Sequence, residues 1–207
     1  TDADVRFQTT AVRLALAFAH SSGADLVSTF PRQITGTLGE RLLTPMIFFV
    51  LLSYLPLGRM RRTTDPSTSA GCGQFILARR DAYLESGGHA AFKDSMHDGI
   101  KMPRSFRRHG YRTDLFDGTA LVSVRMYHGW RQTWTGFAKN AYEGLGSIGM
   151  LGFMTVFHAV AHIGPWMLAP IGFATAQPAV GTLATAAVLC NALQRSMLSA
   201  RFRHPKT

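Results

Sequence analysis

Short apolar stretches alternate with turn residues through the first half of the chain, and each stretch predicts an element. Between Phe7 and His20, apolar residues recur at a spacing that predicts a helix, and Ser21-Ser22-Gly23 predicts its end. The apolar positions of this helix are Val12, Leu14, Leu16 and Phe18. Ala24 to Ser28 predicts a short strand. This order of helix and strand is typical of an α/β fold, in which helices cover a sheet.

The middle of the chain continues with shorter elements. Strands are predicted at residues 75–78, 111–116 and 119–126, and the last two are joined by the turn Asp117-Gly118. Helices are predicted at residues 80–86, 99–109 and 130–143, and glycines mark the ends of the first two.

Pro45 to Leu57 is nearly all apolar, but its about 13 residues are too few for a helix that crosses a bilayer, which takes roughly 20. Arg59, Arg61 and Arg62 follow directly. This order favours a helix near residues 42–57 that lies in the membrane interface and is held by anionic headgroups. A buried core helix is the alternative.

A long stretch near the C-terminus has membrane character, because no Asp, Glu, Lys or Arg occurs between Glu143 and Arg195. At about 1.5 Å per residue it predicts two transmembrane helices, about 147–169 and 180–198, with the turn at Pro178. We therefore expect one domain at residues 1–143 and a membrane domain at residues 144–207. The positive-inside rule places the first domain and both outer ends in the cytoplasm.

Two histidines lie inside that stretch. His158 and His162 are four residues apart and therefore share a helix face. They predict a neutral pair packed between helices, or a metal pair if a third ligand joins them.

The composition narrows the class of protein. The net charge is +10, and the basic residues lie beside apolar runs without any motif of a nucleic-acid-binding module, so we expect a membrane surface or a diphosphate substrate and no nucleic acid. The chain has two cysteines, Cys72 and Cys190, one of them inside an apolar run, so no disulfide framework is expected and a reducing compartment fits.

The first residues carry a candidate metal site. Asp2 and Asp4 are separated by one residue, in the pattern Asp-x-Asp, and would follow an upstream strand. Mg²⁺ and Mn²⁺ take oxygen ligands and often retain substrate phosphates in their coordination shell, so a short acidic motif can hold one of these cations. A solvated turn is the alternative, because this motif is common.

An ordered set of motifs carries a resemblance along almost the whole chain. The set is Asp2-Ala3-Asp4-Val5, Phe30-Pro31-Arg32-Gln33, Gly71-Cys72-Gly73-Gln74-Phe75, Arg79-Arg80-Asp81-Ala82-Tyr83, Gly87-Gly88-His89, Val124-Arg125-Met126-Tyr127 and Gly136-Phe137-Ala138-Lys139-Asn140. With it the chain resembles family 2 glycosyltransferases, in particular bacterial membrane-bound members of the hopene-associated and carotenoid types, which are also similar to ceramide glucosyltransferases.

The resemblance implies a GT-A fold and transfer of a sugar from a nucleoside diphosphate sugar, with inversion, to a lipid or another membrane-associated acceptor. Asp2 and Asp4 would bind the divalent metal, Mg²⁺ or Mn²⁺, and Asp98 would be the catalytic base. His97 stands where relatives commonly carry an acidic residue. The other residues expected to bind donor or acceptor are Gly73, Gln74, His97, Arg131, Trp134 and Lys139. Asp98 could instead cap its helix.

Two departures from the family matter. Arg131-Gln132-Thr133-Trp134 does not match the QxxRW signature of processive relatives, so a single transfer to a lipid is expected rather than synthesis of a polymer. Relatives also carry a nucleoside-binding part before Asp-x-Asp, so we expect this chain to be a piece of an enzyme of the bacterial inner membrane, inactive without its N-terminal half. A non-catalytic membrane remnant, or a subunit that needs a nucleoside-binding partner, is the alternative.

Overall fold

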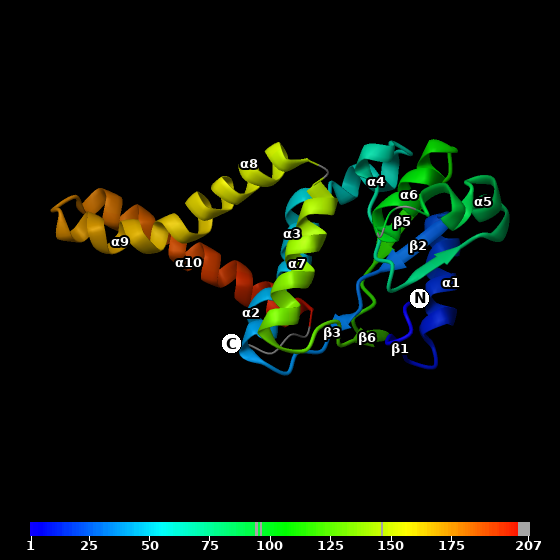
Figure 1. Ribbon diagram of the computed structural model, residues 1–207, viewed down its shortest axis with the longest axis horizontal. Coiled ribbons are helices and arrows are strands. Elements are labelled where there is room, and N and C mark those ends of the chain that lie inside the picture. Colours follow the sequence, from blue (N-terminus) through cyan, green and yellow to red (C-terminus); the bar gives the residue numbers. More distant parts are fainter. Residues whose placement is uncertain (94, 96, 146, 203–207) are drawn as a thin grey trace. The chain divides into compact units, whose positions relative to one another are not determined.

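The computed structural model describes residues 1–93, 95, 97–145 and 147–202, without the side chains of 142–144 (Figure 1). Three basic residues of the C-terminal end, Arg203, His204 and Lys206, therefore lie outside the described part of the chain. Contacts divide the chain into two compact units, one built mainly from Thr1–Thr133 and the other from Trp134–Arg201. The division falls within a helix, before the domain change that we expected after residue 143.

The strands of the first unit, within its described residues, form two small mixed sheets. One sheet has the order β1-β6-β3, and its strands are β1 (Arg6–Phe7), β6 (Val122–Val124) and β3 (Arg32–Gln33). The other has the order β4-β2-β5, with β4 (Ile76–Ala78), β2 (Leu26–Thr29) and β5 (Thr113–Phe116). The central strand β2 is antiparallel to β4 and parallel to β5. A mixture of helices and sheets is thus confirmed.

The two strands around Asp117-Gly118 do not pair with each other. We expected two strands joined by this turn, and both strands exist, but β5 and β6 belong to different sheets. The Thr29 side chain explains the divergence, because its hydroxyl donates to the Phe116 carbonyl at 2.7 Å and accepts the Gly118 N–H at 2.7 Å. These bonds hold the turn against β2, and the chain leaves that sheet there.

Helix α1 (Ala11–Ser22) has a different buried face from the one we expected. Its buried residues are Ala11 and Ala15, whereas Val12 is 51% exposed and Leu14 and Leu16 are also exposed. Residues two apart lie about 200° apart around a helix, so the expected set could not form one face. The helix ends at Gly23, as predicted, with φ of 63°.

The apolar segment after residue 37 folds as three short helices, α2 (Leu38–Leu43), α3 (Met46–Tyr54) and α4 (Leu57–Arg62), followed by the 3₁₀ turn η1 (Pro66–Thr68). Helix α3 buries Phe48 and Phe49 and exposes Val50, Leu52 and Tyr54. The buried Phe48 and Phe49 therefore agree with the core interpretation, while the exposed apolar residues of α3 keep the kind of surface that an interfacial helix needs.

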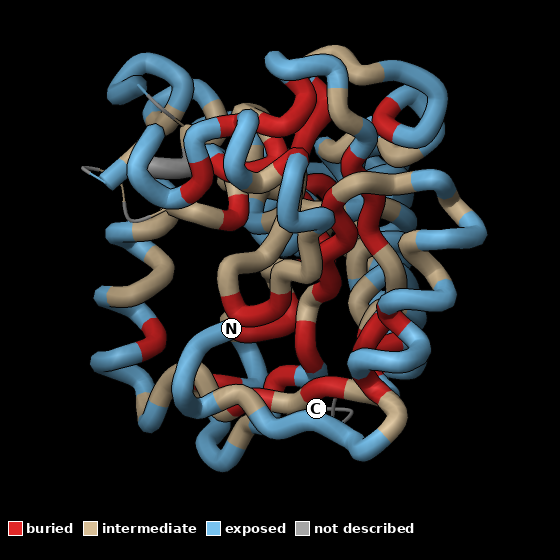
Figure 2. The backbone as a smooth tube through the Cα atoms, turned by 90° about the vertical axis from the view of Figure 1, so that its right-hand side faces the viewer, coloured by how far each residue is buried: buried red, intermediate tan, exposed pale blue. Residues whose placement is uncertain are grey.

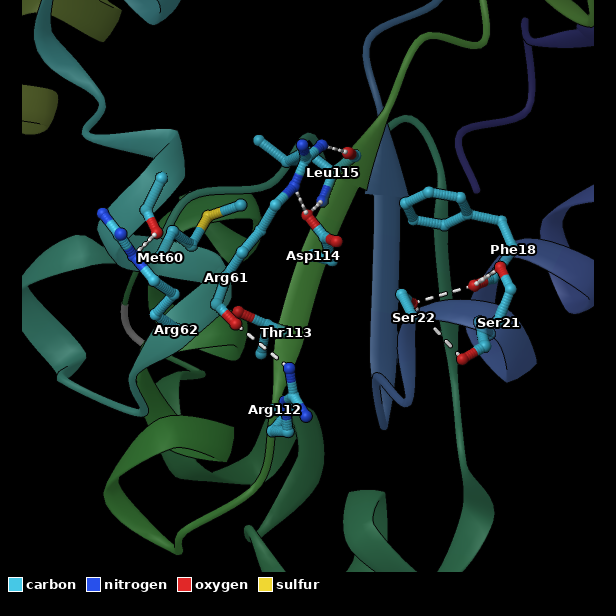
Figure 3. Close-up of polar contacts among 12 residues, drawn as sticks. Phe18, Ser21, Ser22, Met60, Arg61, Arg62, Arg112, Thr113, Asp114 and Leu115 are labelled. Carbon is cyan, nitrogen blue, oxygen red and sulfur yellow. Dashed lines mark hydrogen bonds and ion pairs between the residues drawn. The ribbon is translucent and has the colours of Figure 1, made fainter.

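The arginines after α3 bond within the fold, as Figure 3 shows for Arg61. Its guanidinium donates to the Asp114 carboxylate at 3.1 Å and to the Leu115 carbonyl at 3.2 Å, and Arg112 donates to the Arg61 carbonyl at 3.0 Å. Arg59 pairs with Asp65 at 2.7 Å. These contacts fasten α4 to β5 and use charges that we had assigned to lipid headgroups.

Next along the chain come α5 (Arg80–Glu85), η2 (Gly88–Phe92) and α6 (Asp98–Arg108). Helices α5 and α6 match the predicted helices, and Gly87 and Gly110 have φ of 82° and 83° at their ends. The buried side of α6 carries Met102, Phe106 and Arg107. Met102 and Phe106 pack with Leu26 of β2, whose four residues are all buried, in the interior drawn in red in Figure 2.

Arg107 is a buried cation held by neutral acceptors. It is 3% exposed, and its guanidinium donates to the carbonyls of Met60, Thr63, Asp65 and Thr113 and to the hydroxyls of Thr68 and Thr113. Burial lowers its pKa. Arg107, which lies on the predicted helix 99–109, thus joins α4, η1, α6 and β5 inside the fold.

Helix α7 (Gly129–Leu145) begins in the first unit and ends in the second. The second unit continues with α8 (Ile148–His158), the π-helical turn η3 (Ala159–Ile163), α9 (Gly164–Ala174) and α10 (Pro178–Arg201). In the described part of the chain, one helical stretch, Ile148–Ala174, is long and apolar enough to cross a membrane. It covers the first predicted span. Helix α10 covers the second predicted span, but its mean hydropathy is too low for a membrane span, since it contains Asn191, Gln194 and Arg195.

Helices α9 and α10 pack together closely. Gly172 and Gly181 let their backbones meet, because a Cβ on Gly172 would overlap the backbone of Gly181. The turn before Pro178, where we expected it, includes Ala176 with φ of 53°.

Candidate functional site

A pocket of about 270 Å³ in the first unit gathers residues from four separate segments. Its lining residues are Thr1, Asp2, Gly73, Ile76, Ala78, Tyr83, His89, Asp98 and Met102. Three of them, Asp2, Gly73 and Asp98, are residues to which the sequence assigned a role in binding or catalysis. The fold thus brings together side chains from the chain start, the glycine-rich loop and the beginning of α6.

The glycine-rich loop and the start of α6 pack without space for side chains. A Cβ on Gly73 would overlap the Asp98 carboxylate, and a Cβ on Gly99 would meet the backbone of Gly71 and Gly73 at 2.8 and 2.9 Å. Ser28 of β2 fixes the loop, because its hydroxyl accepts the Cys72 N–H at 2.8 Å and donates to the Phe75 carbonyl at 2.7 Å. The glycines therefore set how closely Asp98 approaches the loop.

Asp98 is the first residue of α6, and its Oδ1 accepts the Gly99 N–H at 2.7 Å. We considered that Asp98 might only cap its helix. His97 occupies the N-cap position instead, without a capping bond from its side chain. The positive end of the helix dipole lies at this place, which favours a carboxylate beside the pocket.

The carboxylates at the pocket repel one another. The pKa of Asp2 is raised by burial, and further by the charges of Asp98 and Asp4. Burial likewise raises the pKa of the Cys72 thiol to about 12, and the charges of Asp2 and Asp98 add to this effect. Cys72 is therefore a neutral thiol next to a concentration of negative charge.

The negative charge of the carboxylates at the pocket bears on the metal that we expected there. Asp2 and Asp4 supply hard oxygen donors, and the rise in the Asp2 pKa is what a bound cation would reverse, so their chemistry fits Mg²⁺ or Mn²⁺. Asp4 is exposed and is not among the lining residues. Over the described residues, no group of three or more His, Cys, Asp or Glu side chains is arranged to hold a metal ion.

Tyr83 and His89 are pocket residues that our sequence reasoning did not select. The Tyr83 hydroxyl lies 2.8 Å from His89 Nδ1 and accepts the His89 backbone N–H at 3.2 Å. A Cβ on Gly88 would overlap the Tyr83 ring, so the Gly87-Gly88 turn allows this contact. Both residues belong to motifs quoted for the resemblance, but only the fold reveals that α5 and η2 bring them to the pocket.

Gln74 lies behind the pocket rather than in its wall. Its side chain is buried, and its Oε1 accepts from Gln33 Nε2 at 3.3 Å and from the Cys72 thiol at 3.6 Å. Gln33 lies on β3 of one sheet, and Gln74 lies shortly before β4 of the other sheet. This hydrogen bond therefore links the two sheets. Gln74 supports the loop and is not among the lining residues, and its expected role in binding stays a prediction.

Other expected site residues are not part of the pocket lining. His97 precedes α6 and Arg131 lies exposed on α7, and neither lines the pocket. Trp134, which is 57% exposed, and the exposed Lys139 belong to the second unit. Their expected contacts with donor or acceptor stay predictions.

Comparison with known proteins adds no relative: no family model, no curated protein and no solved structure matches this chain.

Proposed function

We propose that this chain is the acceptor-side part of a membrane-bound, inverting glycosyltransferase that moves a sugar from a nucleoside diphosphate sugar to a lipid or another membrane-associated acceptor. One observation carries the proposal. Asp2, Gly73 and Asp98, which the resemblance selected from segments far apart in sequence, line one pocket. The mixed α/β architecture is compatible with a GT-A fold, which is part of the proposal.

Asp98 would act as the general base. Its carboxylate would take the proton from an acceptor hydroxyl in the pocket while that oxygen attacks the anomeric carbon of the donor. The bond from this carbon to the diphosphate breaks with its electron pair, and the configuration inverts. A base must lie within hydrogen-bond reach of the hydroxyl, and a carboxylate at the pocket wall meets this need.

Asp2 and Asp4 would hold the divalent cation. When bound, Mg²⁺ or Mn²⁺ supplies positive charge that neutralises the donor diphosphate and the leaving group.

The membrane part of the proposal rests on the stretch Ile148–Ala174. A helix of this length and composition would anchor the first unit at a bilayer. Basic residues precede it and none follows it before Arg195, which favours the cytoplasmic face of a bacterial inner membrane for the first unit. A lipid acceptor would then be presented next to the enzyme by the bilayer itself.

The catalytic role is tested with Asp98→Asn. Because the chain alone is expected to be inactive, it is expressed together with the nucleoside-binding part that it is expected to need. Membranes from these cells are supplied with labelled UDP-glucose, UDP-galactose, UDP-N-acetylglucosamine or GDP-mannose, and labelled lipid is counted. We expect Asp98→Asn to lower turnover by about a hundredfold or more, because the base is lost. Asp81→Asn is the matched control, since Asp81 is an exposed carboxylate paired with Arg79. Equal turnover in Asp98→Asn and in the wild type would refute the role of Asp98.

The metal role has a test that does not depend on turnover. Mn²⁺ should raise the melting temperature of the wild-type protein, because a ligand that binds the folded state stabilises it. Asp2→Asn and Asp4→Asn should each reduce this shift, since a charged oxygen ligand becomes a neutral one. The measurement is a thermal unfolding scan with increasing Mn²⁺, again with Asp81→Asn as control. A shift of the same size in all four proteins would exclude a metal at Asp2 and Asp4.

A further inference from the structure

We infer that Tyr83 and His89 form a hydroxyl-binding pair, so that the pocket takes a polyhydroxyl group, such as a sugar or glycerol head, as the part of the acceptor that enters it. The inference rests on the proposed function where it calls this ligand the acceptor. It concerns two residues with no other assigned role. Its evidence is the hydrogen bonding of the pair, the carboxylates among the other lining residues and the size of the pocket.

The hydrogen bonds of the pair leave it with donor capacity. The Tyr83 hydroxyl accepts the His89 backbone N–H, and it shares one further bond with His89 Nδ1. If the hydroxyl donates that bond, neutral His89 carries its proton on Nε2, which then is a donor. If Nδ1 donates instead, the Tyr83 proton is the donor. In both tautomers the pair keeps one side-chain donor for a ligand.

The rest of the wall supplies the opposite partner. Asp2 and Asp98 line the same pocket, and ionised carboxylates accept hydrogen bonds only. A ligand that satisfies both sides must accept from the Tyr83 and His89 pair and donate to a carboxylate. Hydroxyl groups do both, and a ligand with several of them can contact both sides at once.

Charge and size narrow the ligand further. The lining side chains include two carboxylates and no Lys or Arg, and the Thr1 amino group lies near Asp2, so the side chains favour a neutral hydroxyl group over a phosphate group without a cation. At about 270 Å³, the pocket is below the roughly 300–1,000 Å³ of sites for drug-sized ligands, so it fits a small head rather than a lipid chain. Ile76, Ala78 and Met102 provide an apolar wall against which the C–H face of a sugar can lie.

The test observes His89 directly. The protein is labelled with ¹⁵N-histidine and held in phosphocholine micelles, because a maltoside detergent would itself present hydroxyl groups to the pocket. His89 signals are assigned with His89→Gln, and His109, bonded to the Ser105 carbonyl, is the internal reference. Methyl glucoside and glycerol are then titrated, followed by 1-propanol, ethylamine and inorganic phosphate in separate samples.

We expect saturable shifts of the His89 ring signals with methyl glucoside and glycerol and no change at His109. Tyr83→Phe keeps the ring and removes the hydroxyl, so it should weaken this binding by about threefold to tenfold, the effect of one lost hydrogen bond. Tyr111→Phe is the matched control, because the Tyr111 hydroxyl donates to Glu85 and lies outside the pocket lining. It should bind like the wild type.

Three results would overturn the inference: no shift at His89, an equal affinity in Tyr83→Phe, or a stronger response to 1-propanol, ethylamine or phosphate than to methyl glucoside. The result is separable from the proposed function. If membranes show no sugar transfer while His89 still binds the polyols through Tyr83, the proposed function fails and the hydroxyl site stands. If transfer occurs and His89 shows no shift, the hydroxyl site fails alone.

Discussion

Glu40 shows how much one buried carboxylate can hold together. It is 1% exposed and accepts the N–H groups of Gly36 and Gly129, both at 2.6 Å, and the Thr37 hydroxyl at 2.8 Å, with Arg125 at 3.3 Å. Burial by itself would raise the pKa of this carboxyl. The four donors outweigh burial and lower the pKa from 4.5 to about 2. The ionised form therefore joins the start of α2 to the start of α7.

The stability that Glu40 contributes depends on pH. Since its folded pKa is the lower one, this contribution is complete above a pH of about 4.5 and is lost as the pH falls towards about 2. Glu40→Gln should lower the free energy of unfolding by a few kcal/mol at pH 7, because a neutral amide replaces a buried, bonded anion. The difference from the wild type should narrow at pH 3. Denaturant unfolding at both values is the measurement.

Glu85→Gln serves as the control, because Glu85 is an exposed carboxylate that accepts from Tyr111. It should change stability little at either pH. A difference between Glu40→Gln and the wild type that is as large at pH 3 as at pH 7 would contradict the role of the ionised carboxylate.

At the residue scale, sequence patterns were most informative where chemistry is carried by residue type. Asp2, Gly73 and Asp98 could be selected because the ordered motifs resemble those of a family that has site residues at these positions, and Asp2 also because of its Asp-x-Asp spacing. Tyr83 and His89 could not, because their contact depends on the turn at Gly87-Gly88 and on nothing that spacing expresses. The face of α1 was mistaken for a related reason: large apolar residues suggested burial, whereas close packing against Phe75 and Val122 uses Ala11 and Ala15.

At the scale of elements, the π-helical turn η3 has a polar partner on α10. Asn191 Nδ2 donates to the Ala161 carbonyl at 3.2 Å, which directs Asn191 Oδ1 towards His162 Nδ1, 3.0 Å away. An amide oxygen only accepts, so His162 carries a proton on Nδ1. The rings of His158 and His162 stack with centroids 5.3 Å apart, as expected for a pair packed at a helix contact.

Asn191→Leu removes both hydrogen bonds, so the Ala161 carbonyl of η3 loses a donor. This loss matters because the wider π-helical turn already departs from regular helical hydrogen bonding. We expect a loss of about 0.5–1.5 kcal/mol in stability, the range for such contacts between helices in membranes. Thermal unfolding in detergent measures it. Gln194→Leu, an exposed amide on the same helix, is the control and should have no such effect.

The positions of helices and strands followed well from local signals, since glycines, prolines and apolar runs act over a few residues. Partners did not. The segments around Asp117-Gly118 read as neighbouring strands, yet the Thr29 hydroxyl, from a strand far earlier in the chain, holds the turn and separates them. The π-helical turn likewise could not be predicted from local sequence. Its Ala161 carbonyl accepts a hydrogen bond from Asn191, which lies on another helix.

At the scale of the whole molecule, the second unit predicts how the chain crosses a bilayer. If Ile148–Ala174 spans it, α10 must return, because it packs back along α9 at Gly172 and Gly181. The 24 residues of α10, at about 1.5 Å each, are long enough to cross a core of about 30 Å. A reporter inserted near Gln177 and one fused after Thr207 should therefore lie on opposite sides, with the second in the cytoplasm. Periplasmic activity of the fusion after Thr207 would contradict two crossings.

Arg107 also sets an order in which the first unit can be completed. Its guanidinium reaches carbonyls and hydroxyls in residues 60–68 on one side and Thr113 on the other. Until those segments are in place the cation has water as its best partner, so α6 cannot bury this side early without a large desolvation cost. Asp98 stands at the other end of the same helix. The pocket wall should therefore be among the last parts of the unit to become fixed as the chain folds.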